Sequence, residues 1–390
     1  MRVLFLNTIG RDVWGGGEKW MLAAAAGLRA RKHAVFLAGR AHGELLARAA
    51  ELGFPVTPLR VRGDFNVWAA ARLAALFRRE AIDLVVANFN RDVRLAGLAR
   101  GLARRPLIVA RNGLPILHDN WRYRLTYRRL VAGIVTNARA IRERYLRYGW
   151  IPEDFVKVIP NGIDPALARR ADSALTAGPA DPEAARTNGA AASRALRERL
   201  GIACAAPVVG IFGRLVPQKR HDLFLEAARH VAVAQPAARF LIVGDGPGRE
   251  ALLARAAELG LGARLCFAGF QRDVFPYLAV CDVVALSSDD EGLPNAVMEA
   301  MLAGRCVVAF SVGGVPELLG EGAGVLIAPR DAQSMGREIA KLIADEPRRT
   351  TLAARGRERI LEEFTLDRMV ERLEAYLLDL LGKKSRRQGG

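Results

Sequence analysis

The fold is decided by the segment Val208-Val209-Gly210-Ile211-Phe212, which runs directly into Gly213-Arg214-Leu215-Val216-Pro217-Gln218-Lys219. A short apolar run that ends at a glycine predicts a strand buried on both faces, followed by a tight turn. A helix is expected to begin at the end of that turn. The same order of strand, turn and helix recurs along the chain in both directions.

Further strands are expected on both sides of this segment. In the second half the apolar runs lie at 207–212, 239–243, 264–268, 282–286, 305–309 and 324–327, and in the first half at 2–7, 34–38, 82–87, 106–110 and 133–136. Helical patterns such as Lys19–Ala30 and Val67–Glu80 separate them. This alternation predicts the α/β class, with each half a doubly wound, Rossmann-like parallel sheet. Ligands of such sheets bind beyond the carboxyl ends of the strands.

A chain of 390 residues is long enough for two domains of ordinary size. We expect an N-terminal domain over 1–163 and a C-terminal domain over 164–364. Residues 171–195 are rich in Ala, Gly, Pro, Thr, Asp and Ser without a hydrophobic period, which predicts a flexible insertion. Residues 2–7 are expected to form a strand rather than a signal peptide, and no run is long enough for a membrane-spanning helix. A cytoplasmic protein is therefore expected.

Charge and cysteine content narrow the function. The formal net charge is +17, and Met1–Asp164 holds 28 Lys and Arg against 13 Asp and Glu, a net of +15. A basic first half attracts a membrane surface, a phosphorylated acceptor or nucleic acid, although an Arg-rich genome would also raise the total charge. The four cysteines lack Cys-x-x-Cys spacing, which predicts buried free thiols and no metal site.

Three loops of the second half carry candidate binding residues. Arg214 and Lys219 follow a strand and could reach one anion from two sides, or could simply be solvated. In Gly244-Asp245-Gly246-Pro247-Gly248-Arg249 the third glycine of a dinucleotide fingerprint is missing, so a tight turn is the better interpretation. Gly313-Gly314-Val315-Pro316-Glu317 is by itself ordinary turn chemistry.

The sharpest pattern is Glu291-Gly292-Leu293-Pro294-Asn295-Ala296-Val297-Met298-Glu299. A helix should begin near Pro294 or Asn295, so the amides of Leu293 to Ala296 would form an anion-binding helix N-terminus. Glu299 falls among apolar residues of that helix. A buried carboxylate needs a partner, either sugar hydroxyl groups or a core arginine.

Two segments of the first half are candidates as well. Gly15-Gly16-Gly17 opens a helix and permits close approach of a ligand, or is only a flexible turn. Residues 118–131 interleave aromatic residues with Arg122, Arg124, Arg128 and Arg129. Such a helix could lie at a lipid headgroup boundary, pack within the domain, or contact single-stranded nucleic acid.

Four of these motifs and a fifth at 160–164, taken in order, resemble the family 4 glycosyltransferases, whose two domains face each other across a cleft in the GT-B architecture. The resemblance runs from Met1 to about Leu381 and rests on the loop Gly16-Gly17-Glu18, Pro160-Asn161-Gly162-Ile163-Asp164, Gly213-Arg214-Leu215-x-x-x-Lys219, the pair Glu291 and Glu299, and Gly313-Gly314-x-Pro316-Glu317. It implies that the last helix, 365–381, packs back onto the first domain.

The resemblance also implies residue roles. Arg214 and Lys219 would neutralise the diphosphate of a nucleotide-sugar donor, UDP- or GDP-linked, while Glu291 and Glu299 would hold sugar and ribose hydroxyl groups. The remaining expected donor contacts are Gly16, Gly17, Leu293, Pro294, Asn295, Ala296, Gly269 and Phe270. Transfer would retain the anomeric configuration and need no metal or other cofactor, because cations and a helix terminus stabilise the leaving group.

One departure from the family pattern concerns two strand ends of the first domain. Asn88 and Asn112 stand where many relatives carry histidine, and asparagine cannot act as a base. We therefore expect Asn112, with Arg111, to orient the acceptor or the sugar.

The sequence as a whole predicts a retaining, metal-independent hexosyltransferase that uses a glycan or lipid-linked, anionic acceptor in lipopolysaccharide or cell-surface polysaccharide synthesis, with peripheral contact to the inner face of the cell membrane. A nucleotide-sugar epimerase or hydrolase of the same fold, and a basic nucleic-acid-binding protein, are the alternatives. As a transferase, the protein is expected to have no nucleic-acid partner.

Overall fold

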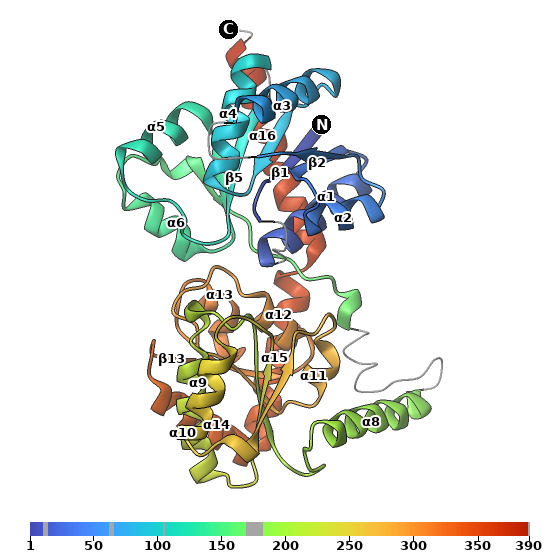
Figure 1. The fold of residues 1–390 in the computed structure, drawn as a ribbon, viewed down its shortest axis with the longest axis vertical. Coiled ribbons are helices and arrows are strands. Elements are labelled where there is room, and N and C mark those ends of the chain that lie inside the picture. Colours follow the sequence, from blue (N-terminus) through green and yellow to red (C-terminus); the bar gives the residue numbers. More distant parts are fainter. Residues whose placement is uncertain (11–14, 62–65, 104–105, 169–181, 389–390) are drawn as a thin grey trace. The chain divides into compact units, whose positions relative to one another are not determined.

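The computed structural model describes residues 1–10, 15–61, 66–103, 106–168 and 182–388. The chain divides into two compact units (Figure 1). Unit 1 consists of Met1–Gly162 and Leu366–Gly390, and unit 2 of Ile163–Thr365. The first crossing between them falls within the motif Pro160–Asp164.

Unit 1 is built on a parallel sheet in the order β3-β2-β1-β4-β5-β6-β7. Alternate residues of β1 enter two separate apolar clusters, Val3 and Phe5 on one face and Leu4 and Leu6 on the other. Helices therefore cover both faces, as expected for a strand that is apolar throughout. The strands are β1 (Arg2–Asn7), β2 (Ala34–Arg40), β3 (Val56–Leu59), β4 (Leu84–Ala87), β5 (Leu107–Asn112), β6 (Gly133–Thr136) and β7 (Val156–Val158).

The helices of unit 1 form two layers. Side chains of α1, α2 and α16 share one cluster, and those of α3 to α6 share the other. The helices are α1 (Gly16–Ala30), α2 (Glu44–Glu51), α3 (Val67–Arg79), α4 (Asn90–Ala103), α5 (Trp121–Leu130), α6 (Arg139–Leu146) and α16 (Leu366–Gln388).

Unit 2 holds a second parallel sheet in the order β10-β9-β8-β11-β12-β13. The strands are β8 (Val208–Phe212), β9 (Arg239–Val243), β10 (Leu265–Gly269), β11 (Val283–Leu286), β12 (Cys306–Phe310) and β13 (Val325–Ile327). The helices are α8 (Pro182–Arg199), α9 (His221–Ala234), α10 (Arg249–Glu258), α11 (Phe275–Ala279), α12 (Asn295–Leu302), α13 (Val315–Leu319), α14 (Ala332–Ala344) and α15 (Glu346–Glu363).

The C-terminal helix α16 packs tightly on α1 within unit 1. Val370, Leu373 and Leu377 are buried in the same cluster as Trp20 and Met21. A Cβ added to Gly27 of α1 would lie 2.3 Å from Val370 Cγ2, so the glycine lets the two helices approach closely. The last element of the chain thus completes the domain that the first element begins.

The predicted fold class is confirmed: both units are parallel-sheet, Rossmann-like domains. Two strands were not predicted, because β3 contains Pro58 and β7 spans three residues. The predicted insertion 171–195 lies outside the described residues as far as 181, and from 182 it belongs to α8. The alanines of this stretch favour a helix where composition alone suggested an irregular segment. Cys204 is exposed, so the prediction of buried thiols was wrong at that position.

Candidate active site

In unit 2, the loops that follow four strands interlock at the carboxyl edge of the sheet. Leu215 N donates to Asp245 O at 3.0 Å and thus joins the loops after β8 and β9. Asp289 N donates to Gln218 O at 2.9 Å, and Gly314 N donates to Gly292 O at 2.9 Å. Backbone hydrogen bonds therefore assemble the loops that carry most of the expected donor contacts.

Two glycines make this close assembly possible. Gly244 has φ +148°, and a Cβ there would lie 1.9 Å from Gly213 O. Gly313 has φ +50°, and a Cβ there would lie 1.7 Å from Glu291 O. Gly244 and Gly313 thus allow the loops to touch, because a side chain at either position would collide with the backbone of the neighbouring loop.

Lys219 and Glu291 meet at the centre of these loops. Lys219 Nζ lies 2.5 Å from Glu291 Oε1, and Ser288 Oγ donates to the same oxygen at 2.6 Å. Glu291 is 5% exposed. The attraction within an ion pair this buried offsets the cost of desolvation only when the geometry is good and further hydrogen bonds are formed. Both conditions are met here.

The other expected residues of unit 2 lie around this pair. Arg214 is exposed, and its side chain forms no ion pair with the part of the chain that the structure describes. Leu293 and Pro294 are buried, and Pro294 is the N-cap of α12, which begins at Asn295 and Ala296. Glu299 is half-buried one turn further along α12.

Gly269 and Phe270 lie at the end of β10. Gly269 has φ +68°, and its carbonyl accepts a hydrogen bond from Gly244 N at 2.8 Å. Phe270 is 64% exposed. An exposed aromatic ring on a loop of this edge is free to stack on a planar ligand group.

A charged network that was not predicted from the sequence is centred on Arg220, next to Lys219 in the chain. Arg220 has φ +49° and pairs with Asp222 and with Asp289, which also pairs with Arg330. Ser287 Oγ donates to the Arg220 carbonyl at 2.8 Å. The hydrogen bond from Arg330, followed by that from Arg220, lowers the pKa of the Asp289 carboxyl. Asp222 is two residues away in sequence, but Asp289 and Arg330 come from distant segments, so the sequence could have indicated only the local part of this network.

His221, the first residue of α9, is also unanticipated. The side chain is buried, and neither ring nitrogen has a hydrogen-bond partner among the described residues. Burial and the neighbouring Lys219 lower the pKa of His221 to about 4. The ring is therefore neutral near pH 7 and cannot add to the positive charge of the site.

In unit 1, Arg111 lies beneath the glycine-rich turn at the start of α1. Arg111 Nη1 donates to Asn88 Oδ1 at 3.4 Å, and Nη2 donates to Asn161 Oδ1 at 3.3 Å. The guanidinium carbon lies 4.7 Å from the centroid of the Trp20 ring. Burial lowers the pKa of Arg111 to about 10, and Glu18 opposes the shift, so the group remains charged at neutral pH.

Asn112 faces the opposite side of the sheet from Arg111, because successive strand residues point to opposite faces. The side chain is buried, and its Nδ2 donates to Tyr145 Oη of α6 at 3.1 Å. The tyrosine hydroxyl in turn donates to Leu114 O at 3.3 Å. The structure therefore places Arg111, rather than Asn112, against the turn that contains Gly16 and Gly17.

A second buried group at this edge is Asp92, in the first turn of α4. Asp92 Oδ1 accepts hydrogen bonds from Thr8 N at 3.0 Å and Thr8 Oγ1 at 2.5 Å. Its other oxygen, Oδ2, has no partner in the described parts of the chain. Burial raises the pKa of Asp92 to about 7, against the lowering effect of the Thr8 hydrogen bonds.

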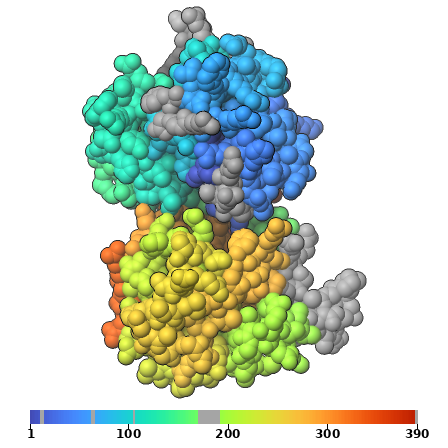
Figure 2. Space-filling view, in the orientation of Figure 1, coloured from blue at the N-terminus to red at the C-terminus, as the bar shows by residue number. Residues whose placement is uncertain are grey.

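The basic aromatic segment forms helix α5, which lies on the surface of unit 1 (Figure 2). Trp121 is 70% exposed, and Leu125, four residues further along the helix, is exposed as well. All four arginines, Arg122, Arg124, Arg128 and Arg129, are exposed. Tyr127 is buried, so part of the aromatic content packs the domain and part faces outward.

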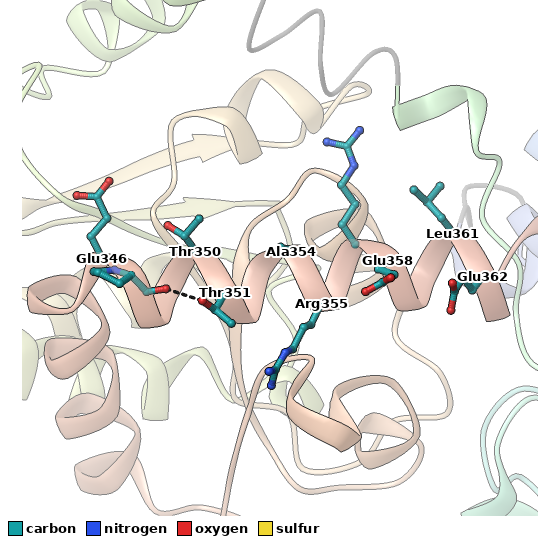
Figure 3. Close-up of a pocket in the computed structure, with 10 residues that line it drawn as sticks. Glu346, Thr350, Thr351, Ala354, Arg355, Glu358, Leu361 and Glu362 are labelled. Carbon is teal, nitrogen blue, oxygen red and sulfur yellow. Dashed lines mark hydrogen bonds between the residues drawn. The ribbon is translucent and has the colours of Figure 1, made fainter.

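A wide depression of about 1180 Å³ lies along α15 in unit 2 (Figure 3). All the side chains that line it belong to this one helix, among them Thr351, Arg355 and Glu358. It holds none of the expected site residues. Over the described residues, no group of His, Cys, Asp and Glu has the arrangement of a metal site, and no helix is long and apolar enough to cross a membrane.

Comparison with known proteins identifies the family. Residues 14–167 match the family model described as Glycosyltransferase Family 4, and residues 193–359 match Glycosyl transferases group 1. The lipopolysaccharide core biosynthesis glycosyltransferase LpsE of Rhizobium meliloti (strain 1021) is 31% identical over 261 residues, which cover 67% of this chain and 67% of that protein. The chain belongs to glycosyltransferase family 4.

A further similar protein and a solved structure agree with this assignment. The 2-deoxystreptamine glucosyltransferase of Streptomyces kanamyceticus is 32% identical over 59% of this chain and 56% of that protein. The crystal structure of Anabaena HepE in complex with UDP and glucose superposes with a TM-score of 0.80 at 25% identity, over 97% of this chain and 99% of that one. This glycosyltransferase therefore has the GT-B type of fold.

Proposed function

We propose that this glycosyltransferase transfers a hexose, with retention of configuration, from a UDP- or GDP-sugar to a glycan or lipid-linked acceptor of lipopolysaccharide or cell-surface polysaccharide synthesis. The observation that carries the proposal is the Lys219–Glu291 pair, held at 2.5 Å among the interlocked loops of unit 2. The similarity to LpsE supports the acceptor class. The similarity to HepE, which was crystallised in complex with UDP and glucose, supports the donor class.

The roles follow from charge and position. Arg214 is exposed and available to an anion. Lys219 carries three N–H donors, one of which forms the hydrogen bond to Glu291. Both cations would stabilise the diphosphate as it leaves, with the amides of Leu293 to Ala296 at the start of α12. Glu291 would accept hydrogen bonds from the hydroxyl groups of the transferred sugar, and Glu299 from the ribose.

The remaining contacts complete the donor site. Gly16 and Gly17 would approach the diphosphate, and Gly269 and Phe270 would meet the base. The leaving phosphate would take the acceptor proton, so the reaction needs neither a metal ion nor a histidine at Asn88 or Asn112. Asn112 retains the proposed role of orienting the acceptor, which Asn112→Ala tests: near-normal turnover would remove it from the chemistry.

The proposal is tested first by thermal shift with UDP-, GDP- and ADP-sugars, then by transfer to candidate acceptors with NMR of the anomeric product. Lys219→Met is expected to reduce kcat about 100-fold, on the scale of losing one preorganised charge contact. Lys341→Met is the control, because the Lys341 side chain also pairs with a glutamate at 2.6 Å but is exposed on the outer face of α14. Stabilisation by a nucleotide sugar without transfer to any acceptor would favour an epimerase or hydrolase.

A peripheral membrane position is the second part of the proposal. The exposed Trp121 and Leu125 could enter the headgroup boundary while the four arginines of α5 bind anionic lipid, which would place the enzyme on the inner face of the cell membrane. Replacing the arginines Arg122, Arg124, Arg128 and Arg129 by glutamine should reduce sedimentation with phosphatidylglycerol vesicles. Unchanged sedimentation would exclude α5 as the contact.

A further inference from the structure

The strongest unexplained feature of unit 1 is the buried guanidinium of Arg111. Arg111 is 5% exposed, and two glycines, Gly17 and Gly113, lie against its guanidinium. A Cβ added to Gly113 would lie 2.5 Å from Arg111 Nη1, and one added to Gly17 would lie 3.6 Å from the same atom. Gly17, in the first turn of α1, therefore lies close to the charged group.

The charge of Arg111 is poorly compensated inside the protein. Its hydrogen-bond acceptors are two neutral amide oxygens at 3.3 and 3.4 Å. The nearby carboxylate of Glu18 accepts instead from Asn7 Nδ2 at 2.8 Å and from Gly15 N at 3.0 Å. Arg111 has no carboxylate within ion-pair distance among the described residues.

Such an arrangement is costly for stability. Burial of an ion that has no ion-pair partner is unfavourable, and an apolar side chain packed against Trp20 would avoid the desolvation. A buried charge with a perturbed pKa at a strand end points to a ligand rather than to stability. The ligand of a cation is an anion.

The turn above Arg111 is suited to a phosphate group. Gly15 is the N-cap of the 15-residue helix α1 and has no side chain that could cap the first-turn amides. The helix dipole and these amides favour an anion, and the charge beneath them strengthens that preference. The nucleoside diphosphate of the proposed function supplies such an anion.

We infer that Arg111 is a positioning residue whose buried positive charge increases the affinity of the Gly15–Gly17 turn for the diphosphate of the donor. The inference rests on the proposed function. Asn88 and Asn161 hold the guanidinium by neutral oxygens, which orient the group without cancelling its charge. This accounts for asparagine at position 88, where a carboxylate would neutralise the cation.

The test compares binding of UDP and of uridine, which lacks phosphate, by isothermal titration calorimetry with the full chain. Arg111→Met should weaken UDP about tenfold, and Asn88→Asp, which keeps the guanidinium but neutralises it, should weaken UDP by about the same factor. Uridine affinity should change less than about twofold, because the base and ribose lie outside the effect of this charge. Arg111→Lys, which keeps the positive charge, should retain most of the difference in affinity between UDP and uridine that Arg111→Met loses.

Arg29→Met is the matched control, because Arg29 also stacks on an aromatic ring, Phe54 at 3.8 Å, but in the last turn of α1. It should leave both affinities unchanged. Equal losses for UDP and uridine in the Arg111 and Asn88 variants would show a purely structural role and overturn the inference, as would unchanged UDP affinity in both. If the unaltered protein binds neither UDP nor GDP, the proposed function fails instead.

Discussion

At the scale of single residues, the molecule places charge where stability alone would not. Lys219 and Glu291 form a nearly buried pair, Arg111 is a buried cation without a paired carboxylate among the described residues, and Asp92 leaves one carboxylate oxygen without a partner in the described chain. Each lies at the carboxyl edge of a parallel sheet, where ligands of this fold class bind. Local charge at these positions is therefore expected to affect function more than folding.

Glu291→Gln is expected to lower kcat at least about 100-fold while the protein stays folded, because the amide keeps the shape of the side chain but no longer balances Lys219. Steady-state kinetics with the best donor from the thermal-shift screen measures the effect. The control is Glu338→Gln, which removes an exposed pair with Lys341. Full activity of the Glu291 variant would contradict its assigned role.

Asp92 gives a pH-dependent prediction. The unfolded carboxyl has a pKa near 3.8 and the folded one about 7, so the folded chain binds more protons between these values. The free energy of unfolding therefore falls as pH rises from about 4 to about 7, and the full contribution is present only below that window. Asp92→Asn lacks this titration, so its melting temperature should exceed that of the parent protein by more at pH 8 than at pH 5, with the two differences about 5 °C apart.

Thermal melts at both pH values check this, with the exposed Asp154→Asn as a control that leaves the pH dependence unchanged. A parallel shift of the Asp92 variant at pH 5 and pH 8 would exclude the titration of this carboxyl as the cause.

At the scale of elements, glycine turns determine how closely the loops approach one another. Gly313 and Gly304 both have positive φ, but only Gly313 presses on another loop, since nothing lies within 4 Å of a Cβ at Gly304. Substitutions at these two glycines therefore distinguish the effect of backbone strain, expected at both positions, from the effect of a steric collision, expected only at Gly313. Backbone strain alone costs about 1–2 kcal/mol for a non-glycine residue in this conformation.

Gly304→Ala should therefore lower the free energy of unfolding by about 1–2 kcal/mol and leave activity intact. Gly313→Ala should cost clearly more and reduce kcat, because the new methyl group displaces Glu291. Urea unfolding and initial rates measure the two effects. Equal stability and activity in both variants would show that the loops have room to separate.

The strands and the loops between them show how much of the structure could be predicted from the sequence. Apolar runs located eleven strands, but β3 and β7 escaped because one contains proline and the other is short. The period of two along β5 could have separated Arg111 from Asn112, since adjacent residues face opposite sides. By contrast, Asp289 and Arg330 support Arg220 from remote loops, and no local pattern encodes such contacts.

At the scale of the whole molecule, unit 1 depends on a helix that lies at the end of the sequence. Val370, Leu373 and Leu377 of α16 are buried against α1. A chain ended after Thr365 should therefore lose the cooperative unfolding of unit 1, because an apolar face of α1 becomes exposed. The transition of unit 2, which is complete within Ile163–Thr365, should persist.

Differential scanning calorimetry of the shortened chain measures these transitions, and removal of residues 387–390 alone is the control. Two unchanged transitions after loss of α16 would show that unit 1 is stable without it.

The position of α16 has a consequence for biosynthesis. A ribosome releases the seven strands of the first sheet early, but the helix that covers α1 emerges only after every residue of unit 2 has been translated. Throughout that interval the nascent polypeptide presents an uncovered hydrophobic surface. Unit 2 can mature while it is being made, whereas unit 1 must wait for the synthesis of α16, and chaperones have their longest access to the surface of α1.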